Sequence, residues 1–162
     1  MSDARVLKET GTGPPMSNLA FRVLALWLRL RERAGDQHQA LLDAGLGPGQ
    51  VVLDYGCGVG SYSVPAAQIV GSGGVVYALD NHPLAIEAVE KRIREANIGN
   101  IRTGLSGCYT GLDAGVVDVV ILFDVLHAVN DQQELLRELH RVLRPGGLVS
   151  VKPDHMSDAD LL

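Results

Sequence analysis

The chain has 162 residues, enough for one domain with its own hydrophobic core. Its formal net charge of −5 argues against non-specific binding to nucleic acid, because such binding needs a basic surface. No apolar run reaches the roughly 20 residues of a membrane-spanning helix, since Arg22 and Arg29 interrupt the segment 19–30. The two cysteines, Cys57 and Cys108, lack metal-ligand spacing. With no signal-peptide pattern either, they favour a cytoplasmic protein.

The N-terminal part is predicted to be helical after a short tail. Residues 1–15 are polar and rich in Gly, Thr and Pro, so we expect a flexible tail. The pattern then predicts helices over 17–33 and 37–44, which together form a helical flap over 17–45. Arginines lie on one side of the first helix and leave a wide apolar face that contains Phe21, Leu24, Trp27 and Leu28.

From Gln50 onward, short apolar segments alternate with amphipathic ones. The predicted strands cover 51–53, 74–79, 100–103, 116–123 and 148–152. The predicted helices cover 61–70, 83–96 and 131–143. The Pro- and Gly-containing run 144–147 is expected to be the turn that ends the last helix.

This alternation of strands and helices predicts the fold class. Strands separated by helices form parallel sheets with right-handed crossovers, so we expect a doubly wound, Rossmann-like α/β fold. The nearly continuous aliphatic run 116–123 suits a central strand that is covered on both faces. We therefore expect a single domain over 16–162, with the Rossmann-like core over 50–152.

A glycine loop, Asp54-Tyr55-Gly56-Cys57-Gly58-Val59-Gly60, directly follows the first strand and precedes a helix. Glycines at alternate positions let the backbone turn sharply and approach a ligand closely. A dinucleotide loop, GxGxxG, would place its third glycine at position 61, which is Ser61 here. Asp54 would repel a pyrophosphate and suits a cationic amino group. We favour a nucleotide-type ligand with a cationic part over a plain turn without a ligand.

The second strand ends at Asp80. An acidic side chain at this strand tip can accept hydrogen bonds from both hydroxyl groups of a ribose. Many such residues merely cap helices, so Asp80 alone is weak evidence for a ribose site. Together with the glycine loop it becomes strong evidence. Asn81 follows it and is predicted to cap the next helix.

Four segments resemble class I S-adenosylmethionine (AdoMet)-dependent methyltransferases, in particular the small-molecule branch similar to the ubiquinone and menaquinone biosynthesis enzymes. The resemblance runs from about Pro14 to Lys152. It is carried by VLDYGCGVGSYSVPAA, VVYALDNHPLAIEAVEKR, VVDVVILFDVLHAV and LLRELHRVLRPGGLVSV.

The resemblance implies AdoMet as cofactor, with S-adenosylhomocysteine as its product. Asp54 and the loop glycines would hold the methionine part, and Asp80 the ribose. His82 would lie beside the adenine or ribose, and Phe123 would contact the cofactor through its backbone. The adenine-edge position, usually acidic in the family, falls near Ser106, so Ser106 or a backbone amide would replace the acid. The candidate cofactor-binding residues are Asp54, Tyr55, Gly56, Cys57, Gly58, Gly60, Asp80, Asn81, His82, Ser106 and Phe123.

Methyl transfer from a sulfonium needs proximity and alignment more than acid–base chemistry. His127, beyond the tip of the fourth strand, is the best candidate for positioning or deprotonating an acceptor, but a surface or capping histidine is an equally good interpretation. Asp154 and His155 are weaker candidates. The first helix is interpreted as a flap beside the cofactor, as a surface for a lipophilic acceptor or membrane, or as ordinary core or an oligomer contact.

The resemblance also implies a sheet of order 3-2-1-4-5 without the antiparallel sixth and seventh strands of the family. Ten residues, 153–162, follow the fifth strand, too few for a helix and two strands. The expectation is an apparently C-terminally short chain whose fifth strand is a bare edge, open to pairing in a homodimer. Two functions stay open: a methyltransferase acting on a small-molecule acceptor, with a lipophilic acceptor as one alternative, and a non-catalytic AdoMet-binding domain. An NAD-dependent oxidoreductase is disfavoured by Asp54 and Ser61.

Overall fold

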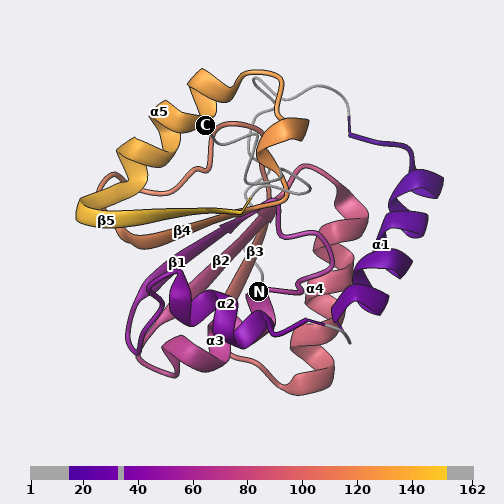
Figure 1. Cartoon of the computed structure of the whole chain (residues 1–162), viewed down its shortest axis with the longest axis horizontal. Helices are drawn as coiled ribbons and strands as arrows, with labels where there is room; N and C mark the ends of the chain where they lie inside the picture. Colours follow the sequence, from indigo (N-terminus) through magenta and orange to yellow (C-terminus); the bar gives the residue numbers. More distant parts are fainter. Residues whose placement is uncertain (1–14, 33–34, 153–162) are drawn as a thin grey trace.

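The computed structural model describes residues 15–32 and 35–152 (Figure 1). Its helices are α1 (Asn18–Glu32), α2 (Gln37–Asp43), α3 (Ser63–Val70), α4 (Pro83–Ala96), the 3-10 turn η1 (Leu126–Ala128) and α5 (Gln132–Val142). Its strands are β1 (Val51–Tyr55), β2 (Val75–Asp80), β3 (Ile101–Leu105), β4 (Val117–Phe123) and β5 (Leu143–Lys152).

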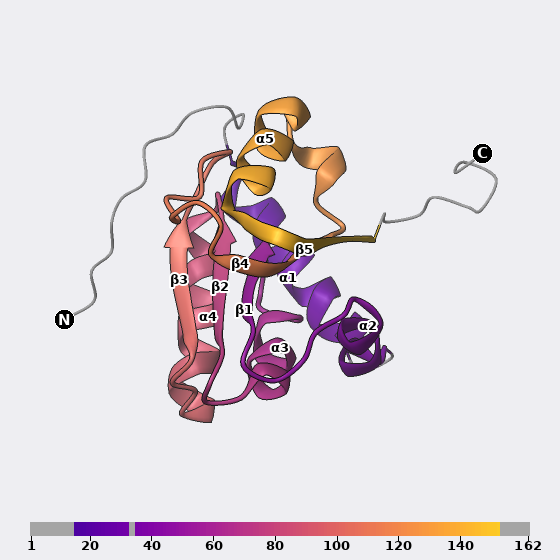
Figure 2. The same ribbon diagram turned by 90° about the vertical axis from the view of Figure 1, so that its left-hand side faces the viewer.

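The described strands form one parallel sheet of order β3-β2-β1-β4-β5, which confirms the predicted fold and strand order. The order places β1, β2 and β4 side by side in the middle (Figures 1 and 2). Because the strands are parallel, their carboxyl ends meet at one edge of the sheet. The loops that leave these ends therefore lie close together, as a ligand site in such a sheet requires.

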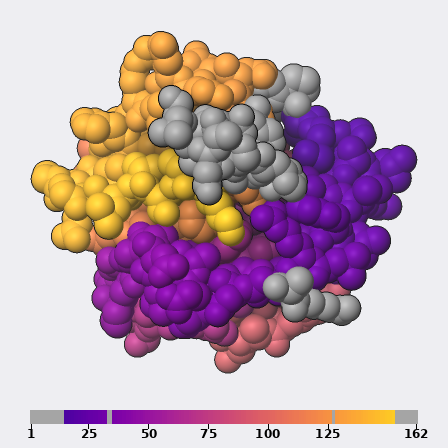
Figure 3. Space-filling model, viewed as in Figure 1, coloured from indigo at the N-terminus to yellow at the C-terminus, as the bar shows by residue number. Residues whose placement is uncertain are grey.

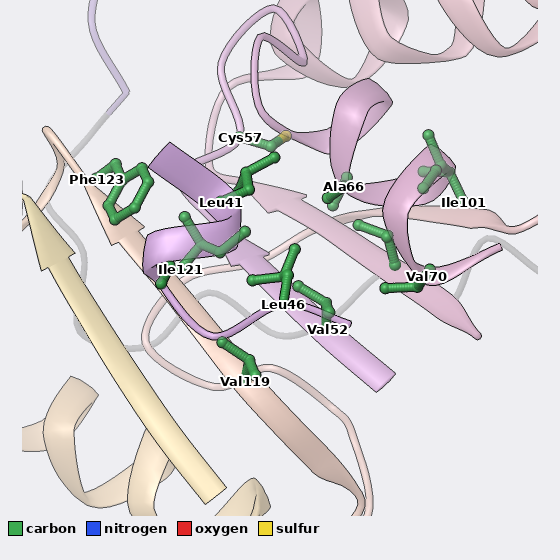
Figure 4. Close-up of a cluster of buried hydrophobic side chains, with 14 of the residues drawn as sticks. Leu41, Leu46, Val52, Cys57, Ala66, Val70, Ile101, Val119, Ile121 and Phe123 are labelled. Atoms are coloured by element: carbon green, nitrogen blue, oxygen red, sulfur yellow. The ribbon is translucent and has the colours of Figure 1, made fainter. Parts of the chain in front are cut away.

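Helices cover both faces of the sheet, so successive residues of the central strands are buried on opposite sides. Val52 packs with α2 and α3 in one hydrophobic cluster, which Figure 4 shows. Leu53 packs with α5 in the other cluster, beside Leu135 and Leu139. These two layers hold β1 rigidly and thereby fix the position of the glycine loop that follows it.

The start of β5 differs from the prediction. Residues 144–147 were expected to form a turn outside the sheet, but β5 already begins at Leu143. Leu143 pairs with Val117 and Leu148 with Val119, so a bulge on β5 takes up the residues between them. Gly146 has a φ of 79° there, and Arg144 forms an ion pair with Asp118 on β4. The Pro-Gly-Gly run therefore makes an irregularity within the strand rather than a separate turn.

Asn81 is not the cap of α4. His82 is the N-cap residue, and its Nδ1 accepts a hydrogen bond from the Leu84 amide at 3.1 Å. Because α4 begins with a proline, which has no N–H group, the Leu84 amide is the first helical donor that needs an acceptor. The His82 imidazole provides that acceptor. Asn81 is left exposed on the loop between β2 and α4.

Candidate cofactor site

The glycine loop crosses the carboxyl edge of the sheet in a backbone conformation that favours glycine. Gly56, Gly58 and Gly60 have φ values of 76°, 52° and 82°. The amides of Gly56 and Cys57 donate to the Leu79 carbonyl of β2, at 2.7 and 3.0 Å. The loop is thus tied to the neighbouring strand, and side chains at the three glycine positions would be strained.

The space beside each glycine differs. A Cβ on Gly56 would lie 2.4 Å from Val125 Cγ2, so this position is filled by protein. A Cβ on Gly60 would lie 3.1 Å from Val89 of α4. Within the described residues, a Cβ on Gly58 would meet only Leu28 Cδ1 of α1, at 3.4 Å. Gly58 therefore marks where the loop is open to a ligand.

Asp80 binds the loop from the tip of β2. Its Oδ2 accepts from the Gly58 amide and its Oδ1 from the His82 amide, both at 2.9 Å. Burial raises the pKa of Asp80 in spite of these hydrogen bonds. Gly58 and Asp80, predicted separately from two motifs, are in direct contact.

Asp54 is buried at the end of β1, with 3% of its surface exposed. The Ser63 hydroxyl donates to its Oδ2 at 2.5 Å. Burial raises the pKa of Asp54 to about 6, the Ser63 hydrogen bond opposes the rise, and the nearby Asp80 adds to it. In the described part of the chain Asp54 has no ion-pair partner.

Tyr55 and Cys57 face the protein interior. The Tyr55 hydroxyl donates to the Gly107 carbonyl at 2.8 Å. Burial raises the pKa of the Tyr55 hydroxyl and also raises that of the Cys57 thiol well above its usual value. A buried neutral thiol is a poor nucleophile, so the surroundings of Cys57 favour packing over nucleophilic chemistry.

His82 is buried and fully engaged by the protein. Its Nδ1 accepts the cap hydrogen bond, so Nε2 carries the proton and donates to the Met16 carbonyl at 3.0 Å. Its ring stacks on Phe21 of α1, with 4.3 Å between ring centroids. His82 therefore links α1 to the carboxyl edge of the sheet.

Ser106 lies in the turn after β3, beside the tip of β2. Its amide donates to the Asp80 carbonyl at 2.9 Å. Its hydroxyl lies 2.9 and 2.8 Å from the carbonyl oxygens of Gly107 and Tyr109. The side chain is thus used to shape its own turn.

The tip of β4 contains a residue that the sequence interpretation missed. Phe123 is buried and meets Tyr62 edge-on, with 4.9 Å between centroids. The next residue, Asp124, has a φ of 56°, uncommon for a residue with a side chain. Its Oδ2 pairs with Arg31 at 3.0 Å, and its Oδ1 is buried without a hydrogen-bond partner among the described residues. Only its place just after a strand tip could have drawn attention to it.

The other predicted catalytic positions carry less structural information. The backbone of His127 lies in η1, beyond the tip of β4, but its side chain is outside what the structure describes. Asp154 and His155 also lie outside the described residues. Their roles stay predictions.

Helix α1 lies over the glycine loop. Leu28 contacts the Gly58 position, and Phe21 packs with Val59 of the loop and Ala85 of α4. At its end, Glu32 pairs with Arg92 at 2.8 Å and accepts a hydrogen bond from the Ser61 hydroxyl. The flap is therefore held against the edge where the predicted cofactor residues gather.

A parallel sheet of this order, with a glycine loop after β1 and an aspartate at the tip of β2, is a Rossmann-like nucleotide-binding arrangement. Residues 53–151 match the family model described as a methyltransferase domain, so the chain belongs to the class I AdoMet-dependent methyltransferase family.

Named relatives agree with this family. An arsenite methyltransferase of Halobacterium salinarum is 34% identical over 110 residues, and a demethylmenaquinone methyltransferase of a Geobacillus species is 29% identical over 103 residues. These alignments cover 67% and 62% of this chain. The chain spans 28% and 44% of the lengths of these curated relatives.

A solved structure agrees as well. The crystal structure of a SAM-dependent methyltransferase from Aquifex aeolicus superposes with a TM-score of 0.76 at 25% identity. The match covers 85% of this chain and 72% of the Aquifex chain.

Proposed function

We propose that the chain binds AdoMet at the carboxyl edge of β1, β2 and β4 and transfers its methyl group to a small-molecule acceptor. The observation that carries the proposal is the Gly58 amide held by the Asp80 carboxylate under an open position of the glycine loop. Membership of the methyltransferase family supports the same function.

The residues at this edge fit the cofactor. Among the described residues, only a terminal methyl group of Leu28 approaches the space that a Cβ at Gly58 would enter, so a ligand can reach the loop backbone after a small side-chain shift. Asp54 offers a buried carboxyl group to a cationic amino group. Asp124 Oδ1, buried without a partner among the described residues, is an acceptor that a donor group of the ligand would satisfy.

Each candidate residue has a role in this proposal. Asp54 and the amides of the loop glycines hold the methionine part. Asp80 keeps acceptor capacity for the ribose beside the Gly58 and His82 amides, because a carboxylate has about four acceptor sites. Around the adenine lie the exposed Asn81, the ring of His82 and the backbone at Ser106. Phe123 offers its backbone, while Tyr55 and Cys57 fix the loop from inside.

When bound, AdoMet would supply a methyl group carried by a sulfonium. On transfer the sulfur keeps the electron pair of the broken carbon–sulfur bond, and S-adenosylhomocysteine is left. The chain's part is to align the acceptor in line with that group and to exclude water. Helix α1 covers the loop and serves the second task. His127 is proposed to position the acceptor and to accept its proton where the acceptor must lose one.

The acceptor is proposed to be lipophilic. The relatives' names include a demethylmenaquinone methyltransferase, and α1 beside the site has several exposed apolar side chains. An enzyme whose acceptor partitions into apolar phases gains from an apolar surface next to its cofactor.

An AdoMet-binding domain without turnover of its own is the second candidate, and β5 favours it. This edge strand leaves Leu148, Val149 and Val151 between 40% and 52% exposed. An apolar edge strand is a template for pairing, so a second copy or another polypeptide segment would cover it and complete the acceptor side. A homodimer in solution whose methyl transfer rises with dimer concentration would support this candidate.

Titration calorimetry with AdoMet, S-adenosylhomocysteine and NAD tests the proposal. The first two are expected to bind and NAD to fail. Asp80→Ala is expected to weaken binding by about 1–3 kcal/mol, the usual cost of losing charged hydrogen bonds. The exposed Asp113→Ala serves as the matched control. Preferential NAD binding, or unchanged affinity in Asp80→Ala, would refute the assignment, and a methyl-release assay over a compound panel then separates the two candidates.

A further inference from the structure

The outward face of α1 is an unpartnered apolar stripe made of Leu19, Val23, Leu26, Trp27 and Leu30. These side chains are between 43% and 74% exposed. At about 100° per residue they share one side of the helix. Phe21 and Leu28, which contact the cofactor edge, lie on the opposite side. In the described structure α1 is therefore apolar both where it is covered and where it is not.

The charges around the stripe are basic. Arg22 and Arg29 are exposed along one edge, and Arg31 lies over the Trp27 ring at 5.2 Å on the other. The helix has one acidic residue, Glu32, and its carboxylate points inward to Arg92. A chain with a net charge of −5 thus carries its exposed apolar stripe on a locally basic helix.

The combination of apolar stripe, basic edges and an aromatic side chain at the margin matches a helix that lies in the surface of a membrane. A second copy fits less well, because antiparallel face-to-face pairing of two α1 helices brings the arginine edges of both copies to the same side. No described helix is long and apolar enough to cross a bilayer, so the match is to surface binding.

We propose that α1 docks the protein on anionic lipid bilayers, with its apolar stripe in the headgroup region and Arg22 and Arg29 on the lipid phosphates. Figure 3 shows α1, in indigo, along one margin of the molecule, free of β5. Docking would hold the cofactor edge beside the bilayer, where a lipophilic acceptor is concentrated. That consequence rests on the proposed function, whereas the docking itself does not.

The chain contains a built-in probe, because Trp27 is its single tryptophan. Phosphatidylcholine vesicles with phosphatidylglycerol are expected to shift its fluorescence to shorter wavelength and to carry the protein in a flotation assay. Pure phosphatidylcholine vesicles should bind it far more weakly, and high salt should release it. Equal binding to both vesicles, or no binding to either, would overturn the proposal.

Variants separate the two contributions. Val23→Ser with Leu26→Ser is expected to abolish the fluorescence shift, while Leu42→Ser, at an exposed position of α2, should leave it unchanged. Arg22→Gln and Arg29→Gln are each expected to weaken binding about five-fold, the equivalent of about 1 kcal/mol per basic residue near an anionic surface. The arginine variants keep the stripe intact, so they decide the matter even if the double serine variant fails to fold.

Two further readouts complete the test. Circular dichroism and calorimetry with S-adenosylhomocysteine are expected to be unchanged in the arginine variants, so loss of docking and loss of the cofactor site are distinguishable. Light scattering without lipid is expected to give the same mass for the wild type and the serine variant. A dimer that depends on the stripe would identify a second copy as the occupant and refute membrane docking.

Discussion

Two buried carboxyl groups, Asp54 and Glu138, are held in opposite ways. Glu138 of α5 accepts hydrogen bonds from the Thr110 amide and hydroxyl, at 2.9 and 2.6 Å, and from the Arg141 guanidinium, at 2.7 and 2.8 Å. Burial acts to raise the pKa of Glu138, but the hydrogen bonds from Arg141 and Thr110 outweigh it and lower the pKa. Asp54 has the Ser63 hydroxyl as partner and Asp80 nearby, and its pKa is raised to about 6.

This difference suggests that Glu138 has a structural role and Asp54 a functional one. The charge of Glu138 is balanced within the fold, so its network stabilises the attachment of α5 to the loop after β3. The charge of Asp54 is not balanced by a cation of the described chain, which costs stability without a ligand. Strained or unbalanced groups of this kind gather at functional sites. Changes around Asp54 should therefore affect binding, and changes around Glu138 should affect stability.

The largest expected effect concerns the loop next to Asp54. Gly58→Val places a branched side chain in the open space above the loop, at a φ of 52°, and is expected to lower the affinity for S-adenosylhomocysteine more than 100-fold. The strain of a left-handed residue costs about 1–2 kcal/mol of folding free energy. Calorimetry and urea unfolding measure the two effects.

Gly47→Val is the matched control, since no heavy atom of the described residues, its chain neighbours aside, lies within 4 Å of the added Cβ. It should change neither quantity by much. If the valine at position 58 prevents folding, Gly58→Ala tests the same space with a smaller side chain. Normal binding by a folded Gly58 variant would show that the loop does not hold the ligand.

The next effect is on stability alone. Glu138→Ala leaves the Thr110 amide without its acceptor and Arg141 without its carboxylate partner, and is expected to cost about 3–4 kcal/mol in the free energy of unfolding. Affinity for S-adenosylhomocysteine should stay within two-fold of wild type, roughly 0.4 kcal/mol. Gln133→Ala, on the exposed side of α5, is the control. If Glu138→Ala strongly lowers the affinity without lowering the stability, Glu138 belongs to the binding site and the comparison with Asp54 is wrong.

The parts of the site that follow from local sequence could be predicted. The glycine loop and Asp80 sit at strand ends, and the parallel sheet brings strand ends together, so their contact follows from the topology. The strand order was expected from the family resemblance and not from these local patterns, and it was confirmed.

Other features depend on contacts between distant residues and left no local pattern. Arg31 and Asp124 are 93 positions apart, and the pairing of Glu138 with Thr110 spans 28. The bulge of β5 was predicted to be a turn, because proline and glycine occur in turns as well as in bulges. His82, not Asn81, is the helix cap because α4 begins at Pro83, and its ring stacks on Phe21 of α1, a contact that the local sequence does not show.

The smallest expected effect has opposite signs for stability and binding. Asp54 has a folded-state pKa of about 6 against 3.8 for an ordinary aspartate. A raised pKa means that this group favours the folded state fully below pH 3.8 and that the benefit is lost as the pH rises through about 6. The loss is at most about 3 kcal/mol, from about 1.4 kcal/mol per pKa unit. Asp54→Asn stays neutral and should therefore be more stable than wild type at pH 8 but not at pH 4.

The same variant is expected to bind AdoMet more weakly at pH 8, because the carboxylate that meets the cationic amino group is gone. Urea unfolding and calorimetry at pH 5 and pH 8 measure both effects, and Asp113→Asn, exposed, is the control. An equal loss for AdoMet and S-adenosylhomocysteine indicates contact with the amino group, which both molecules contain. A loss for AdoMet alone indicates contact with the sulfonium instead. If Asp54→Asn is less stable than wild type at pH 8 and binds both ligands normally, Asp54 is a structural group like Glu138.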